Sequence, residues 1–194
     1  MNLKRIATAR LRIRFFMTHL MHRLFHRPAD VICGRKFSSC TFDPFTHHMR
    51  GVLRMGKAVK LGRGIDLNIR AGGELSIGSN VRITGNTYIC ADEKVTIGDN
   101  VLIAEFCTIR DSDHGIAADR LICDQPGTSL PVTIGSDVWI GAGCAILKGA
   151  TVPDGCVIGA HSVVLRNSKL VPGGIYAGTP VRLIRMRAPE TPQK

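Results

Sequence analysis

The sequence contains one short stretch in which a histidine is flanked by carboxylates, Asp111-Ser112-Asp113-His114-Gly115. A neutral imidazole can accept a proton from a hydroxyl group near neutral pH. His114 is therefore a candidate general base. Asp111 and Asp113 are also common turn-forming residues, and a histidine in a loop is usually only solvated. The stretch alone leaves the catalytic and the structural interpretation open.

A metal site at His114 is not expected. His161 is the only other histidine in the repetitive part of the chain, and a zinc site needs three or four protein ligands. The chain has 7 cysteines, an odd number, and none forms a CxxC pair. We predict that they are reduced, with Cys144 and Cys156 filling the core as small apolar residues. No cysteine or serine lies in an evident nucleophile motif.

A period of six residues predicts the elements that position His114. From Val132 to Tyr176 a large apolar residue occupies every sixth position: Ile134, Ile140, Ile146, Val152, Ile158, Val164, Leu170 and Tyr176. This period fits neither a helix nor an alternating strand. It is typical of a solenoid in which each hexapeptide forms one flat side of a three-sided coil. The same spacing occurs in two earlier series: Leu53, Val59, Ile65, Ala71, Ile77, Ile83 and Ile89, then Ile97, Ile103 and Ile109.

The period is interrupted twice, by two extra residues between Ile89 and Ile97 and by a long insertion between Ile109 and Ile134. Repeat proteins present such insertions as loops on one face, which is often the binding face. The sequence therefore predicts a loop over 110–133 that begins with the stretch containing His114. We expect the chemistry of the protein at this loop.

The two ends of the chain differ in pattern from the repeat. Residues 1–27 predict a basic amphipathic helix, which would either cover one end of the solenoid or lie on an anionic membrane surface. Residues 28–52 have no stable period and are predicted to be an irregular lead-in. The β-helix domain is expected over 53–180, followed by a basic end-piece and frayed tail over 181–194.

The formal net charge of +11 favours anionic partners such as lipid headgroups or phosphorylated small molecules. Nucleic acid is not expected, because the basic residues are not interleaved with aromatic ones and no DNA-binding motif is present. No transmembrane span or secretory signal is evident. The expected location is cytoplasmic, with peripheral contact at the inner face of the membrane as an alternative.

The repeat resembles that of the hexapeptide-repeat acyltransferases, as in Ile77-Gly78-Ser79-Asn80-Val81. Within them it is most similar to the galactoside/maltose O-acetyltransferases and the polysaccharide-biosynthesis acetyltransferases. The similarity covers roughly 53–185, with specific runs at 95–104, 132–146 and 176–185. It implies an all-β fold, a left-handed parallel β-helix with one long loop insertion. It also implies acetyl-CoA as co-substrate and a homotrimer with active sites between subunits.

The resemblance further implies roles for single residues. His114 matches the histidine that opens the loop, the general base in direct transfer from acetyl-CoA to the acceptor without an acyl-enzyme. Asp92 matches an acidic residue of the acceptor pocket. The acceptor-binding asparagine corresponds in the best register to Thr84, with Asn86 nearby. The positions matching the coenzyme A site are Trp139, Gly141, Ala142, Ala160, Arg166, Arg182 and Arg185.

Each of these residues also has a plain structural interpretation. Trp139 could only shield a coil, Asp92 could only shape the short insertion, and the arginines could form a solvated basic end. For the whole chain, the resemblance favours O-acetylation of a sugar or glycan precursor, in surface polysaccharide biosynthesis. N-acetylation of an amino-sugar or small amine and a non-catalytic β-helix scaffold are the alternatives.

Overall fold

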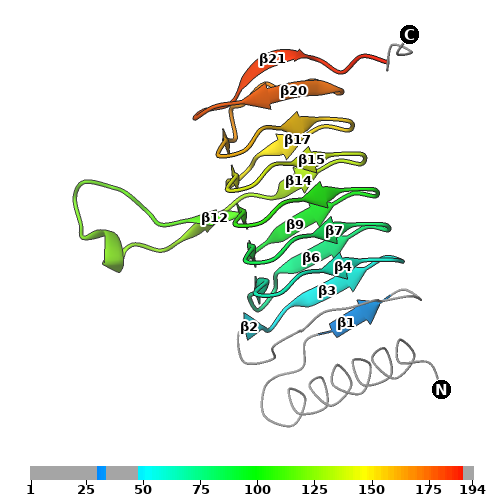
Figure 1. Ribbon diagram of the computed structural model, residues 1–194. Helices are drawn as coiled ribbons and strands as arrows, with labels where there is room; N and C mark the ends of the chain where they lie inside the picture. Colours follow the sequence, from blue (N-terminus) through cyan, green and yellow to red (C-terminus); the bar gives the residue numbers. More distant parts are fainter. Residues whose placement is uncertain (1–29, 34–47, 190–194) are drawn as a thin grey trace, which may run out of the picture.

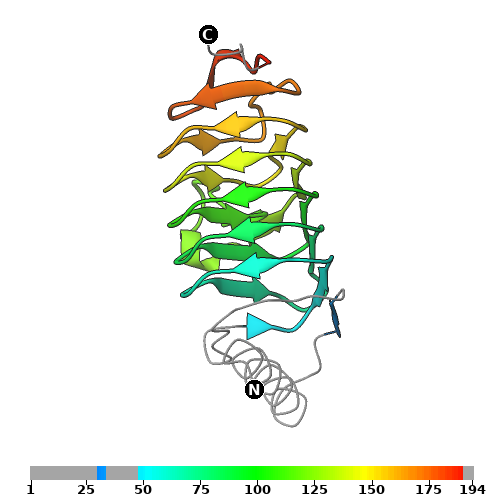
Figure 2. The ribbon, with the colours of Figure 1, turned by 45° about the vertical axis from the view of Figure 1, so that its right-hand side comes forward.

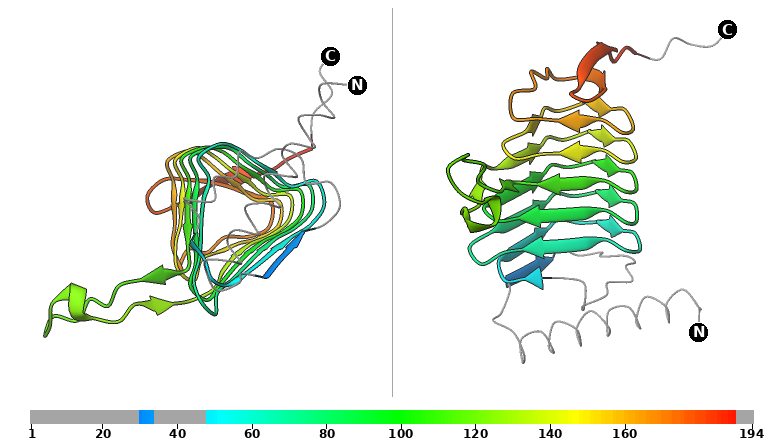
Figure 3. Two further views of the ribbon diagram at one scale, coloured as in Figure 1. Left: turned by 90° about the horizontal axis from the view of Figure 1, so that it is seen from below. Right: turned by 90° about the vertical axis from the view of Figure 1, so that its left-hand side faces the viewer.

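The computed structural model describes residues 30–33 and 48–189. The described chain winds into a three-sided left-handed parallel β-helix whose coils stack along one axis (Figures 1 and 2). Seen along that axis the coils form a triangle (Figure 3). The predicted helix over 1–27 lies outside the described residues.

Each side of the triangle is one parallel sheet, except for a single antiparallel pair at the C-terminal end. The first sheet contains β1 (Asp30–Cys33), β3 (Val52–Met55), β6 (Glu74–Ile77), β9 (Lys94–Ile97), β14 (Val132–Ile134) and β17 (Thr151–Val152). The second contains β4 (Lys60–Leu61), β7 (Arg82–Ile83), β10 (Leu102–Ile103), β15 (Trp139–Ile140), β18 (Val157–Ile158), β20 (Gly174–Ala177) and β21 (Arg182–Met186). The third contains β2 (His48–Met49), β5 (Asp66–Ile69), β8 (Tyr88–Ala91), β11 (Thr108–Arg110), β16 (Ala145–Ile146) and β19 (Val163–Val164).

The core is a set of apolar stacks inside the triangle. Strand register places Ile83, Ile103, Ile140 and Ile158 above one another in the second sheet, all at most 1% exposed. Equivalent stacks run up the other two sheets, so each coil buries its side chains against the coils above and below. The period of six is confirmed in this part of the chain.

The first coil is an exception, and the predicted register there is wrong. The structure pairs Leu53 with Leu75 and Leu67 with Ile89, and Ala71 is exposed in a turn. The residues equivalent to the later period are Met55 and Leu67, two positions beyond those predicted. Side chains two apart in a strand face the same side, so both sets are buried and the period could follow either.

The extra residues of all coils fall at one corner, which joins the third sheet to the first. We call it the insertion corner; it comprises 70–73, 92–93, 111–131 and 147–150, and in the last coil it begins at residue 165, from which the chain continues to β20 of the second sheet. The corner that joins the second sheet to the third has four residues in every coil. We call it the compact corner; it comprises 62–65, 84–87, 104–107, 141–144 and 159–162. The third sheet lies between these two corners.

The segment 28–52, predicted to be irregular, contains strands β1 and β2, which pair in parallel with β3 and β5. At the other end β21 runs antiparallel to β20 and occupies part of the predicted end-piece. Arg187 then ties the chain to lower coils, donating to Asp137 Oδ2 (2.7 Å) and to the carbonyl of Gly155 (2.9 Å). Over the described ranges, no helix has the length and apolar character needed to span a bilayer.

Candidate active site

His114 lies at the base of the long loop that leaves the insertion corner (Figure 1). The loop begins after β11 with the antiparallel pair β12 (Ser112–Asp113) and β13 (Thr128–Ser129), and it projects away from the coils. His114 follows β12 directly and is exposed. Within the described part of the chain its imidazole has no hydrogen-bond partner. A ligand can therefore reach the ring.

Asp111 anchors this loop to the coil below. Its carboxylate is 0% exposed and accepts three backbone hydrogen bonds, from the N–H groups of Asp92 (2.8 Å), Glu93 (2.8 Å) and Lys94 (2.7 Å). Its carbonyl accepts a further bond from the N–H of Leu130 (2.8 Å), which closes the loop base. Asp111 thus has a structural role: it fixes the backbone at the loop base, close to His114.

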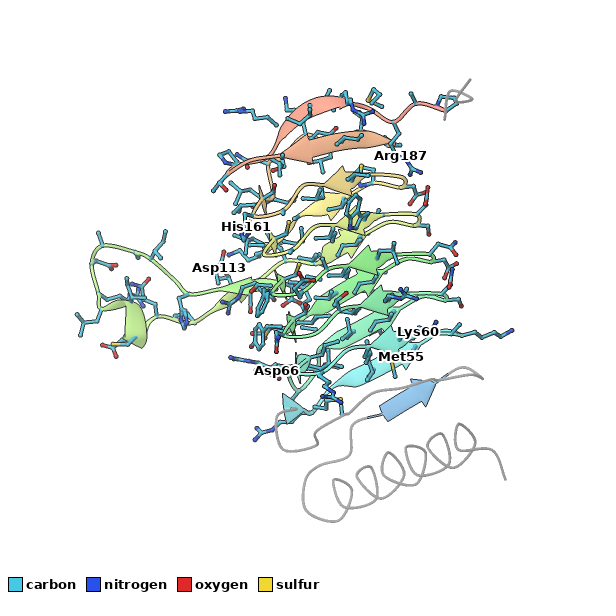
Figure 4. The ribbon with its side chains drawn as sticks, viewed as in Figure 1. Met55, Lys60, Asp66, Asp113, His161 and Arg187 are labelled. Atoms are coloured by element: carbon cyan, nitrogen blue, oxygen red, sulfur yellow. The ribbon has the colours of Figure 1, made fainter. Side chains whose placement is uncertain are left out.

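Asp113 has a second anchoring role, toward the coil above. Its Oδ2 lies 3.0 Å from Lys148 Nζ, which also donates to Thr128 Oγ1 (2.8 Å). Lys148 therefore holds both strands of the loop stem, on which Figure 4 labels Asp113. Sequence patterns did not identify this lysine as a site residue, because its partners lie about twenty or more residues away in the chain.

Gln125 braces the loop from inside. Its side-chain amide donates to the carbonyls of Ala117 (2.9 Å) and Arg120 (3.1 Å), and its Oε1 accepts from the N–H of Ala117 (2.7 Å). Gln125 is 8% exposed, while the short 3-10 helix beside it (η1, Ile122–Asp124) has no buried residue. The loop is thus held together by hydrogen bonds and has no apolar core, which explains why hydrophobic periodicity did not reveal its structure.

Asp92, the predicted acceptor residue, lies at the insertion corner beside the base of the His114 loop. Its Oδ1 is 3.2 Å from Arg70 Nε and accepts a hydrogen bond from the Cys90 thiol at 3.2 Å. Its backbone N–H is one of the three bound by Asp111. The structure therefore brings Asp92 and His114 onto one corner.

The other predicted acceptor residues, Thr84 and Asn86, are exposed at the compact corner. The same corner carries Ala142 and Ala160, and the N–H of His161 donates to the Ala142 carbonyl at 2.8 Å. Ala142 and Ala160 thus form a strip of small residues over two consecutive coils of this corner. A narrow ligand could approach the backbone along the strip.

Close packing against the next coil requires glycine at position 141. A Cβ atom there would lie 2.6 Å from the backbone nitrogen of Ala160 in the next coil, closer than van der Waals contact allows. Trp139 lies beside it on β15 and is 54% exposed. Arg182 is paired with Ala177 at the top of the strip, and Arg185 follows with Ile175; both arginines are exposed.

Arg166 does not join this strip. Its side chain lies over Gly149 at the insertion corner, with Cγ 3.0 Å from where a Cβ of Gly149 would be. The N–H of Gly149 donates to the carbonyl of Leu130 at the end of the His114 loop (3.1 Å). The predicted site residues therefore form two groups at opposite edges of the third sheet. His114, Asp92 and Arg166 occupy one edge, and the remaining residues follow the compact corner and the second sheet that leads to it.

The described cysteines inside the coils are not placed for covalent chemistry. Cys107 and Cys144 are 1% exposed, and each donates to a carbonyl, of Gly141 (3.2 Å) and Gly159 (3.0 Å) respectively. Burial raises the pKa of the Cys156 thiol. These thiols act as core residues.

Comparison with known proteins places this fold among bacterial transferases. The sequence model described as "Bacterial transferase hexapeptide (six repeats)" matches residues 131–166. The chain is 41% identical over 116 residues to galactoside O-acetyltransferase of Escherichia coli K12, covering 57% of this chain and 56% of that protein. It therefore spans only about half the length of that relative. A crystal structure of the hexapeptide-repeat acetyltransferase VCA0836 from Vibrio cholerae superimposes with a TM-score of 0.59 at 26% identity, covering 69% of this chain and 73% of that one.

The chain is also similar to the putative lipopolysaccharide biosynthesis O-acetyl transferase WbbJ of Escherichia coli K12. The two are 30% identical over 173 residues, covering 84% of this chain and 87% of WbbJ. Sequence repeat, three-sided fold and near full-length similarity agree, and the chain belongs to the hexapeptide-repeat family of acetyltransferases.

Proposed function

We propose that the protein transfers the acetyl group of acetyl-CoA to a hydroxyl of a sugar or glycan precursor. The proposal rests on the exposure of the His114 side chain and on the anchoring of the loop that carries it. The imidazole is exposed and unpartnered within the described ranges, yet it follows a loop base pinned by the buried Asp111 carboxylate. A fixed, accessible imidazole is what proton abstraction from a bound hydroxyl needs.

In the proposed reaction His114 takes the proton of the acceptor hydroxyl as its oxygen attacks the thioester carbonyl. The new C–O bond forms, the C–S bond breaks, and the coenzyme A thiolate takes the proton back from the imidazolium. A backbone N–H at the transfer point stabilises the tetrahedral oxyanion. No residue forms an acyl intermediate, in keeping with the buried positions of Cys107 and Cys144.

We assign the coenzyme A arm to the compact corner. Ala142 and Ala160 leave room beside the backbone, and Trp139 offers an exposed apolar face next to them. Arg182 and Arg185 lie at the top of the strip, where guanidinium groups would bind the nucleotide phosphates. The Vibrio cholerae relative has also been solved in complex with acetyl coenzyme A.

The separation of the two groups supports a site shared between chains. His114, Asp92 and Arg166 lie at the insertion corner, whereas Thr84 and Ala160 lie at the compact corner, across the third sheet. In a ring of identical chains one corner of each chain meets the other corner of its neighbour. We therefore propose a homotrimer in which one chain supplies the base and the next supplies the acetyl-CoA strip.

The names of the relatives guide the choice of acceptor. They include a galactoside O-acetyltransferase and a putative lipopolysaccharide biosynthesis O-acetyl transferase. We propose a surface polysaccharide precursor, modified on the cytoplasmic side of the membrane. The basic residues within 1–27 would hold the enzyme near an anionic membrane surface.

Thiol release from acetyl-CoA tests the proposal. The purified protein is incubated with acetyl-CoA and either methyl galactosides, methyl glucosides, glucosamine or no acceptor. We expect release that depends on a sugar hydroxyl and an alkali-labile ester product. An alkali-stable amide formed only on glucosamine would indicate an N-acetyltransferase. No acceptor-dependent release with any sugar would contradict the proposal and favour a scaffold.

A further inference from the structure

Phe106 is an exposed aromatic residue in an unfavourable backbone conformation. It is 63% exposed and has a φ of 60°. Left-handed φ values are adopted readily by glycine and asparagine but are costly for a bulky side chain. The equivalent residues of the adjoining coils at the compact corner are Asn86 and Gly143, which follow this rule. The strain at Phe106 is not offset by burial among the described residues of its own chain, which favours a partner outside the chain.

At the compact corner, Phe106 lies between the predicted acceptor residues and the proposed acetyl-CoA strip. Its N–H donates to the carbonyl of Gly85 in the coil below (3.3 Å), next to Thr84 and Asn86. In the coil above, the N–H of Gly143 donates to the carbonyl of Glu105 (2.9 Å). The ring is therefore placed one coil above the proposed acceptor residues and one coil below the start of the proposed acetyl-CoA strip.

Phe106 also belongs to the coil from which the catalytic loop departs. The chain runs from β10 through Phe106 to β11 and then directly into Asp111 and His114. If identical chains surround an axis parallel to the solenoid, equal coils lie at equal height. Phe106 of one chain then lies level with the base of the His114 loop of its neighbour, where the acetyl group would be transferred to the acceptor.

We propose that Phe106 is an acceptor-binding residue that sets specificity. Its ring would stack on the apolar C–H face of a pyranose and turn one hydroxyl toward His114 of the neighbouring chain. Aromatic side chains supply such flat, rigid contact area at little cost in conformational entropy. Leu102 on β10, 49% exposed, and Trp139 on β15, 54% exposed, are paired on the second sheet, which leads to this corner, and add exposed apolar surface there. This inference rests on the proposed function and adds the residue that would select a sugar ring.

The test is the substitution Phe106→Asn, because asparagine suits a left-handed φ. We expect the variant to melt about 2–4 °C higher than wild type, since strain is removed. We expect its KM for the best methyl glycoside of the panel to rise about tenfold or more, while its KM for acetyl-CoA stays within about twofold. Phe106→Tyr, which keeps the ring, should retain a KM near that of wild type.

Ala58→Gly is the matched control, because Ala58 also has a left-handed φ of 58° but lies at the corner between the first and second sheets. It should raise the melting temperature without changing either KM. An unchanged sugar KM in an active Phe106→Asn variant would overturn the inference and leave the proposed function standing. A lower oligomer mass by sedimentation would overturn it as well, because Phe106 would then be a subunit contact. A wild-type protein inactive on every sugar would contradict the proposed function itself.

Discussion

Replacing His114 with alanine is expected to lower kcat for acetyl transfer by about 10²–10⁴-fold, the usual contribution of a general base. The fold should be unaffected, because the imidazole is exposed and has no hydrogen-bond partner within the described chain. The KM for acetyl-CoA should change little, since His114 acts on the acceptor hydroxyl and is not one of the proposed coenzyme A residues. Initial rates of thiol release at saturating acetyl-CoA measure the effect.

Arg120→Ala is a suitable control for His114→Ala. Arg120 is exposed on the same loop, and among the described residues its side chain pairs only with the exposed Asp119, at 3.7 Å. Such a surface pair contributes little, so this variant should keep wild-type rates. If His114→Ala retained the kcat of the Arg120→Ala variant on every acceptor, His114 could not be the general base.

Replacing Asp111 with alanine is expected to have the largest effect on stability. Three backbone N–H groups of the coil below would lose a buried, ionised acceptor. Hydrogen bonds to charged groups contribute about 1.5–3 kcal/mol each, and unsatisfied buried donors add a penalty. Because water can enter the cavity and satisfy part of the loss, we expect a net fall of about 3 kcal/mol in the free energy of unfolding. Urea denaturation at fixed protein concentration measures it.

Asp113→Ala provides the comparison within the same stretch. The Asp113 side chain is 50% exposed and makes one ion pair, with Lys148. Loss of this ion pair should lower the free energy of unfolding by less than about 1 kcal/mol. Acetyl transfer should fall in Asp111→Ala even below its unfolding transition, because the loop base that positions His114 is released. Equal stability of the two variants would show that the buried carboxylate does not anchor the loop.

The period of six was enough to predict the three-sided solenoid and its main interruption. From Ile77 onward the residues of the period enter the core stacks of the three sheets in turn, so sequence spacing and spatial register coincide. In the first coil the two diverge, because Leu53 and Met55 both face inward and either can continue the pattern. Short repeats fix the face of a side chain better than they fix its register.

The polar parts of the site were harder to predict. Asp111 and Asp113 look alike in the sequence, yet one is buried against a lower coil and the other pairs with Lys148 of the coil above. Gly141 matches a coenzyme A position, but the backbone of Ala160 already requires a glycine there. Arg166 follows the strip residues in sequence and still lies at the insertion corner. Such distinctions depend on which coils touch, and hydrophobic periodicity carries no information on that.

The most direct test of the account is complementation between two inactive chains. One chain carries His114→Ala; the other carries Ala160→Glu, whose bulk and charge would obstruct the proposed coenzyme A strip. The two are co-expressed with different tags, and only mixed assemblies are purified. In every mixed trimer, one of the three interfaces joins the intact His114 of one chain to the intact coenzyme A strip of the next chain. About a third of the wild-type thiol release should therefore return. Thiol release no higher than that of the two separate variants would contradict the shared site.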